Sequence, residues 1–386
     1  MIDSPNIPVW ADPQWEDATA GAAAWTSLPV LDGDRHCSTC VIGLGGSGLT
    51  AIDELLSKGD DVIGVDGHDV GAGAAGRNGG FLLAGAYDFY HDAQRLHGAE
   101  RTRAIYQATL EEIARIANAT PHSVRFVGSR RLAASEWEIE DCRKQLNAMR
   151  ADNWEAEWYE GDDGIGLTLP SDASFNPLVR CRALAEQVRS RGARLYAQSA
   201  VTELSSGRVV TAKGVIHCQR IIVAVDGKLE QILPELSDRV RTARLQMLAT
   251  EPTVERIVPC PMYYREGYEY WQQLPNGSIA LGGFRDQAME NEWTLDTKPA
   301  NPIQRLLEQF LRDKLGVSAA ITHRWAASAG YSNSGLPVLG QIRDRVWAIG
   351  GYSGTGNVIG ALCGRAVVAL ALDGDAGPAR LLVPLS

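Results

Sequence analysis

One segment, CVIGLGGSGLTAIDELLSKGDDVIGVD (residues 40–66), constrains the fold of this chain more than any other. A short apolar run leads into Gly43, Gly45 and Gly48, which match the pattern G-x-G-x-x-G. Apolar residues then recur at helical spacing, and a second apolar run ends on Asp66. This order of strand, glycine turn, helix, strand and acid predicts a dinucleotide-binding unit. A glycine-rich turn in another kind of α/β unit is the alternative.

Each part of this unit has a physical role in the prediction. Gly43 permits a tight turn, Gly45 lets the backbone approach a pyrophosphate, and Gly48 lets the helix pack closely on the sheet. The free N–H groups at the helix start would face phosphate oxygens. Asp66 would accept hydrogen bonds from ribose hydroxyls and repel a 2′-phosphate, which disfavours NADP. The candidate cofactor-binding residues here are Gly43, Gly45, Gly46, Ser47, Gly48, Asp66 and Gly67.

Two further glycine clusters lie far from the first along the chain. In GAGAAGRNGG, residues 71–80, only Arg77 and Asn78 are strongly polar, and they could bind phosphate or the polar edge of a flavin ring. In VWAIGGYSGTGN, residues 346–357, a strand runs through glycines towards an apolar helix, with Asn357 as its expected cap. One ligand that would use both helix starts is FAD, with its diphosphate on the first and its pyrimidine edge on the last. Alone, either cluster could be an ordinary loop or turn.

Together the three clusters resemble the FAD-dependent D-amino-acid oxidase superfamily, in the branch of glycine oxidase, sarcosine oxidase and, most similar, γ-glutamylputrescine oxidase. The motifs that carry the resemblance are LDGDRHCSTCVIG, AGRNGG and SGLPVLG…VWAIGGYSGTGN. It implies an α/β (α+β) fold with a Rossmann-like FAD-binding domain from residues 1–90, 173–240 and 326–386. A mainly antiparallel substrate domain with a helical insertion would comprise residues 91–172 and 241–325.

The resemblance also implies further cofactor contacts. The backbone of Val201 would recognise adenine, and a turn from Ala224 to Gly227 would lie near the ribose or phosphate. Ala75 stands where relatives often have Ser, and Thr355 where they often have His. The segment SNSGLPVLG contains no cysteine for covalent attachment, so the FAD is expected to be noncovalent. The remaining candidates are Ala74, Ala75, Arg77, Asn78, Gly79, Gly80, Val201, Ala224, Gly351, Tyr352, Gly354, Thr355, Gly356 and Asn357.

Such a flavoprotein would oxidise the CH–NH bond of a small amino acid or amine by hydride transfer to flavin N5. Water would hydrolyse the imine, and O2 would reoxidise the flavin with release of H2O2. We expect Tyr268 and Tyr270, on one strand face with Gln272, to line the substrate site, with Trp271 as a further aromatic wall. Arg285 or Arg265 would bind a substrate carboxylate. Tyr270, Arg285 and Tyr268 are therefore the candidate catalytic residues, and His323 is a weaker candidate beside the ring. Packing between lobes and solvated arginines are the structural alternatives for these side chains.

Bulk properties exclude several classes of function. The net charge of −10 without a basic stripe argues against nucleic acid. The apolar run 358–372 is interrupted and too short for a bilayer, and residues 1–15 lack the features of a leader, so we expect a cytoplasmic protein. Seven scattered cysteines predict neither a disulfide framework nor a metal site, and Cys37-x-x-Cys40 is interpreted as a strand entry. A flavin dehydrogenase with another electron acceptor, a non-catalytic flavoprotein and an NAD-dependent dehydrogenase are the competing hypotheses.

Overall fold

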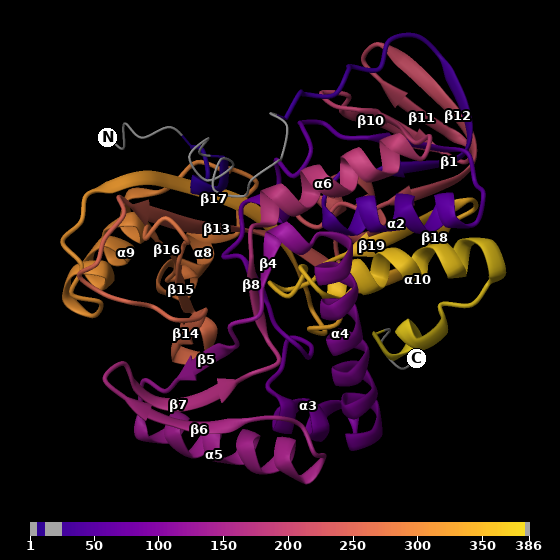
Figure 1. Ribbon diagram of the computed structural model, residues 1–386. Helices are drawn as coiled ribbons and strands as arrows, with labels where there is room; N and C mark the ends of the chain where they lie inside the picture. The colour runs from indigo at the N-terminus through magenta and orange to yellow at the C-terminus, as the bar shows by residue number, and fades with distance from the viewer. Residues whose placement is uncertain (1–5, 12–24, 383–386) are drawn as a thin grey trace.

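The computed structural model describes residues 6–11 and 25–382, and Figure 1 shows its elements. A first eight-stranded sheet has the order β10-β11-β12-β1-β2-β9, with β19 paired to β12 and β18 paired to β19. Strands β1, β2, β9, β12 and β19 run parallel, whereas β10, β11 and β18 join through antiparallel pairs. The strands are β1 (Arg35–Ile42), β2 (Val62–Val65), β9 (Arg194–Tyr196), β10 (Val201–Ser205), β11 (Arg208–Thr211), β12 (Gly214–Val223), β18 (Val338–Arg343) and β19 (Val346–Gly350).

Three helices pack beside one another on this first sheet (Figure 1). They are α2 (Gly46–Ser57), α6 (Pro177–Ser190) and α10 (Ile359–Asp373). Leu49, Ile52 and Leu55 of α2 are fully buried, because the helical spacing of these residues places them together against the strands. The core between the helices and the sheet therefore holds the start of α2 in a fixed position at the carboxyl end of β1.

A second eight-stranded sheet has the order β17-β13-β16-β15-β14-β5-β7-β6. Its neighbours are antiparallel except for the parallel pair of β14 and β5, so the predicted antiparallel lobe is present. The strands are β5 (Ser129–Leu132), β6 (Glu157–Gly161), β7 (Gly164–Leu169), β13 (Val240–Thr250), β14 (Met262–Tyr264), β15 (Glu269–Gln273), β16 (Ile279–Gly283) and β17 (Ile321–Ser332). Strand β17 stays in this sheet up to Ser332, past the expected domain limit at residue 325.

A small third sheet and several helices complete the described chain. The third sheet has the order β3-β8-β4, formed by β3 (Phe81–Leu82), β8 (Ala173–Phe175) and β4 (Val124–Arg125). The predicted helical insertion is present, since three of the helices lie between residues 90 and 151. The helices are α3 (Tyr90–His97), α4 (Ala99–Ala119), α5 (Glu136–Ala151), α7 (Leu229–Ile232), α8 (Met289–Glu292) and α9 (Asn301–Asp313).

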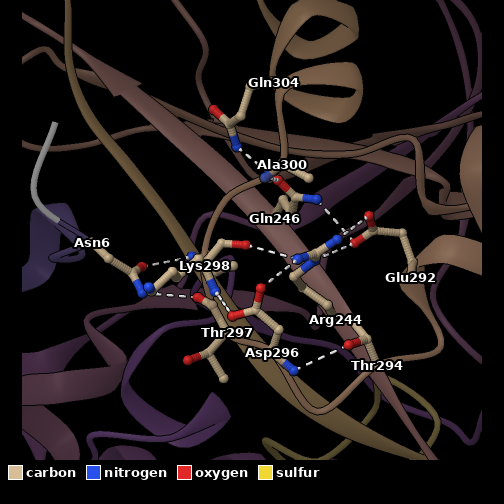
Figure 2. A network of polar contacts seen from close by, with 11 residues as sticks. Asn6, Arg244, Gln246, Glu292, Thr294, Asp296, Thr297, Lys298, Ala300 and Gln304 are labelled. Carbon is tan, nitrogen blue, oxygen red and sulfur yellow. Dashed lines mark hydrogen bonds and ion pairs between the residues drawn. The ribbon is translucent and has the colours of Figure 1, made fainter. Parts of the chain in front are cut away.

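A buried polar network, shown in Figure 2, fastens the segment after α8 to strand β13. Arg244 donates two hydrogen bonds to the carboxylate of Glu292, at 2.8 and 2.9 Å, and a third to the carbonyl of Lys298. Gln246 donates to the same carboxylate at 2.9 Å. Asn6 donates to the carbonyl of Thr297 at 2.8 Å, which ties a segment near the N-terminus to this loop. Because the two buried charges, Arg244 and Glu292, pair with each other, their burial is tolerated.

The mixed α/β fold that the sequence predicts is confirmed. Cys40 lies buried within β1, and all seven cysteines are free, as expected. Over residues 6–11 and 25–382, no helix combines the length and apolar character needed to cross a membrane. Most of residues 1–15, on which the expectation of no leader rests, lies outside the described part of the chain.

Candidate active site

The first glycine turn joins β1 to α2 and is built so tightly that two positions require glycine. Gly43 has a φ of 106°, and a Cβ there would lie 2.6 Å from the carbonyl oxygen of Ala224. A Cβ on Gly48 would lie 1.9 Å from the carbonyl oxygen of Gly43. The first glycine turn therefore packs on the turn from Ala224 to Gly227 that the resemblance implied. The N–H of Ala224 donates to the carbonyl of Ile42 at 2.7 Å. The local geometry is that of a tight backbone turn that leads directly into the start of a helix.

Asp66 follows β2 and faces this turn, as the sequence predicts. The backbone N–H groups of Leu44 and His68 each donate to its carboxylate at 2.8 Å. Burial raises the pKa of Asp66, and these two hydrogen bonds oppose that increase. The N–H of Ser199 donates to the Asp66 carbonyl at 2.7 Å, which brings the segment before Val201 beside Asp66. Gly67 packs on Ala200 of that same segment, so the candidates Asp66 and Gly67 lie together just after the carboxyl end of β2.

Two asparagines join the second and third glycine clusters. The amide of Asn78 donates to Asn357 Oδ1 at 2.9 Å, and Asn357 Nδ2 donates to Asn78 Oδ1 at 3.1 Å and to the Phe81 carbonyl at 2.9 Å. The expectation that Asn357 caps the last helix is wrong, because α10 begins at Ile359 after Val358 and its cap makes no side-chain hydrogen bond. Asn357 instead holds the two clusters together, although 279 residues separate it from Asn78.

Asp226, within the predicted turn from Ala224 to Gly227, anchors the third cluster. Asp226 accepts hydrogen bonds from the N–H groups of Tyr352 and Gly330 at 3.0 Å each. Burial raises the pKa of Asp226 to about 6, against the effect of these donors. The Tyr352 ring packs on Gly356 and on the start of α10, which in turn touches Ser47 of α2. The fold thus brings the first and third clusters to adjoining helix starts. The sequence indicated the turn that contains Asp226 but no role for this carboxylate.

A cavity of about 470 Å³ lies between the glycine clusters and the second sheet. Its walls include Tyr268, Tyr270 and Arg285, all three candidate catalytic residues. Tyr270 packs edge-on against Phe81, with ring centroids 6.1 Å apart. Candidate cofactor residues also line the cavity, namely Ala74, Arg77, Asn78, Gly79, Gly354, Thr355 and Asn357.

Arg285 lies between two aromatic rings at the edge of this cavity. Its guanidinium carbon is 4.3 Å from the ring centroid of Tyr331 and 4.7 Å from that of Trp293. Its Nη1 is buried and has no hydrogen-bond partner in the described structure. Tyr331 also lines the cavity, but the sequence analysis did not predict it as a site residue. It lies between two serine-containing segments that match no motif. A guanidinium held in this way keeps a free donor edge for an anion.

Several predicted substrate residues have other roles. Arg265 forms ion pairs with Glu269 and Asp286, at 2.5 and 2.6 Å, so it is not available for a carboxylate. Trp271 points into the core of the second sheet and packs on Phe310, not into the cavity. Alternation along β15 explains this outcome, since Tyr270 and Trp271 must lie on opposite faces.

Three more predicted residues make contacts that the sequence did not indicate. Gln272, on the same face as Tyr270, donates to the carbonyl oxygens of Gly79 and Gly80. Arg77 donates to the carbonyls of Asn6 and Ala326, at 3.2 Å each. His323 lies near the far end of β17, outside the cavity lining, with Nδ1 2.8 Å from the hydroxyl of Thr322.

Comparison with known proteins assigns the family. Residues 38–370 match the family model described as FAD dependent oxidoreductase, DAO. The chain belongs to this family. The cofactor of the DAO family is FAD, which decides against the NAD-dependent alternative and confirms the resemblance seen in the glycine clusters.

Several known proteins are similar to this chain over nearly its whole length. It is 27% identical to gamma-glutamylputrescine oxidoreductase of Escherichia coli, in an alignment that covers 92% of this chain and 88% of the relative. It is 25% identical to the probable oxidoreductase OrdL of Rhizobium meliloti, over 89% and 85% of the two chains. The fold is similar to glycine oxidase from Bacillus cereus, with a TM-score of 0.73, 17% identity and coverage of 90% and 99%. For L-proline dehydrogenase from P. horikoshii the TM-score is 0.74, at 17% identity and coverage of 89% and 95%.

The geometry of this chain fits FAD. A Cβ on Gly45 would lie 3.0 Å from the Cβ of Ala75, so the first and second clusters pack directly on each other. The second and third clusters both open onto the 470 Å³ cavity, which is of a size that takes a small-molecule ligand. A long cofactor with a diphosphate in its middle and a planar flavin ring at one end matches the start of α2 beside this contact and the cavity next to it.

Proposed function

We propose that this chain oxidises the CH–NH bond of a small amino acid, with noncovalently bound FAD and with dioxygen as the final electron acceptor. The observation that carries the proposal is the single cavity shared by the second and third glycine clusters and by Tyr268, Tyr270 and Arg285. When bound, the flavin supplies a two-electron acceptor for the substrate C–H bond. The name of the Escherichia coli relative, gamma-glutamylputrescine oxidoreductase, supports a substrate that contains an oxidisable amine.

The side chains of the cavity support a substrate that also carries a carboxylate. Arg285 would hold the carboxylate through its unpartnered Nη1, while Trp293 and Tyr331 keep its plane fixed. Tyr270 is kept in place by contact with Gly79, so it would form a rigid wall beside the ring position. Orientation of this kind lowers the barrier because the reacting C–H bond is held in a productive position.

The chain would hold FAD through the three glycine clusters. The first turn of α2 would bind the diphosphate with its free N–H groups, and Asp66 would accept hydrogen bonds from the ribose. The N–H groups of Gly354 and Gly356, unlike those of Tyr352, Ser353 and Thr355, are not used by other described residues, and they would lie at the ring and stabilise negative charge on it. The segment before Val201 would lie beside the adenine.

The experiment is an anaerobic screen in which amino acids and the corresponding decarboxylated amines are offered to the FAD-loaded protein. Loss of the visible flavin absorbance identifies the substrate, and peroxide release on admission of air identifies the acceptor. We expect an amino acid to bleach the flavin and air to release peroxide. Bleaching without peroxide would assign a different acceptor. A yellow protein that no amine bleaches would contradict the proposed reaction.

Substitution of Arg285 tests the carboxylate. Arg285→Met should raise KM for the amino acid about ten- to hundredfold, because a hydrogen bond to a charged group contributes about 1.5–3 kcal/mol. KM for the decarboxylated amine should change little. Arg241→Met is the matched control, since Arg241 also stacks on Trp293, at 4.5 Å, but is exposed and outside the cavity lining. Equal losses for both substrates would mean that Arg285 has only a structural role.

A further inference from the structure

An arginine outside the glycine clusters lies buried beside the first of them. Arg180, in the first turn of α6, is 4% exposed. Its Nε is buried without a hydrogen-bond partner. Within residues 6–11 and 25–382, its guanidinium interacts with other charges only at longer range, and no carboxylate forms an ion pair with it. An isolated buried charge is costly, and a guanidinium does not escape that cost by losing its proton.

The nearest acidic group does not neutralise this charge. Glu112 of α4 is fully buried, and it is already paired with Arg365 at 3.2 Å and with Arg115 at 3.4 Å. Arg365, which also lies near Arg180, is itself neutralised by Glu112 and by Glu54, the latter at 3.3 Å. Burial lowers the pKa of Arg180, which shows how little compensation the protein itself provides. Among the described residues, the acidic groups near Arg180 are therefore engaged by other arginines, and its guanidinium has no counter-ion of its own.

The guanidinium lies at the N-terminus of α2. Its Nη1 is 2.6 Å from the point that a Cβ on Gly46, the first residue of α2, would occupy. The cap residue Gly45 has no side chain that could accept a hydrogen bond from the helix start. The N–H of Leu49 donates to the carbonyl of Gly45, which is the first hydrogen bond of the helix. The N–H groups of the first turn are thus free for a ligand, and the helix dipole places partial positive charge at the same end. A side chain at position 46 would fill the space that the guanidinium takes.

We propose that Arg180 binds the diphosphate of FAD together with the first turn of α2. The inference rests on the proposed placement of FAD on the first glycine cluster, and it adds a charged contact that the glycine pattern does not contain. The two diphosphate charges would supply the partner that the guanidinium lacks, and a planar guanidinium suits phosphate oxygens in a bidentate contact. The same anion would also satisfy the free N–H groups of α2.

The test compares Arg180→Met with wild type after removal of the flavin. We expect the FAD dissociation constant, from flavin fluorescence on titration, to rise about ten- to hundredfold. Affinity for riboflavin, which has no diphosphate, should stay within about twofold. The apoprotein of the variant should unfold at the same urea concentration as wild type or at a higher one, because an unpaired buried charge has been removed. Arg189→Met, at an exposed position of the same helix, is the control and should leave all three values unchanged.

A second measurement uses wild-type apoprotein. Inorganic pyrophosphate should raise its unfolding midpoint, and this increase should be smaller in Arg180→Lys, whose ammonium lacks the planar fork. No increase in wild type would overturn the inference. Two results for Arg180→Met would also overturn the inference. One is an unchanged affinity for FAD, and the other is an equal loss of affinity for FAD and riboflavin together with a destabilised apoprotein. Both would leave the proposed function intact. Failure of wild type itself to bind FAD would overturn both.

Discussion

At the scale of single residues, Asp66 is the side chain whose proposed role is most directly testable. Two backbone N–H groups already hold its carboxylate in place, so its remaining lone pairs point at fixed positions. We predict that Asp66→Ala weakens FAD binding about ten- to hundredfold, through loss of charged hydrogen bonds to the ribose. Titration of the apoprotein with FAD measures this change.

The control for Asp66 lies at the opposite end of the same strand. Asp61 precedes β2, is exposed, and pairs with Arg194 at 2.7 Å. Asp61→Ala should leave FAD affinity unchanged. If both variants bind FAD as wild type does, the ribose contact has been assigned to the wrong residue.

A second residue-scale prediction concerns the pH dependence of stability. Asp172 lines the cavity, and burial raises its pKa from 3.8 to about 7, although Ser129 and the Ala84 N–H donate to it. Between these two values the folded chain keeps a proton that the unfolded chain loses. The stability that the protonated Asp172 contributes is therefore complete below the pKa of the unfolded chain, and it is lost as the pH rises through the pKa of the folded chain.

We accordingly predict a flatter pH profile for Asp172→Asn. Between about pH 5 and about pH 7, the free energy of unfolding should fall more steeply in wild type, by up to about 1.4 kcal/mol per pH unit. Urea unfolding of the apoprotein at several pH values measures the difference. Parallel profiles would show that Asp172 is not protonated in the folded chain over this range.

At the scale of elements, the contact between α2 and α10 depends on a glycine in the middle of a helix. A Cβ on Gly364 would lie 2.5 Å from the carbonyl oxygen of Ser47. Helix propensity alone favours alanine over glycine by about 1 kcal/mol. Forcing two packed helices apart costs about 1–3 kcal/mol, and the obstacle here is backbone, so we predict that Gly364→Ala is destabilising.

Thermal unfolding of Gly364→Ala decides the sign. Gly340→Ala, where a Cβ would have no neighbour within 4 Å, is the control and should be close to neutral. Displacement of α10 should also weaken FAD binding, because the third glycine cluster leads into this helix. A more stable Gly364→Ala variant would mean that the helices separate without cost.

The elements also show which parts could be predicted from sequence. The unit from Gly43 to Asp66 is local: its pattern contains the strand, the turn, the helix and the acid, and the structure has each of them in place. The role of Asn357 was not local, because its partner Asn78 lies on a different segment. For the same reason the sequence could not distinguish Arg285 from Arg265. Folding brings Glu269 and Asp286 to Arg265 as acidic partners, and only these partners show that it is not available to a substrate.

At the scale of the whole molecule, the proposed FAD site joins segments from most of the chain. Ligand that binds only the folded state stabilises it by about 2.7 kcal/mol at a concentration one hundred times the dissociation constant. We predict that removal of FAD lowers the unfolding temperature of the entire chain in one transition, and that added FAD restores it. Calorimetry of both forms measures this, and equal unfolding temperatures would contradict a site built from distant segments.

The order of strands in the first sheet has a consequence for synthesis. Strands β1, β12 and β19 lie side by side, yet β19 ends only at Gly350. A nascent polypeptide therefore exposes its first glycine turn long before the neighbouring strands leave the ribosome. Flavin capture at the proposed site would therefore wait until β19 has been synthesised, and products terminated before Val346 would be colourless.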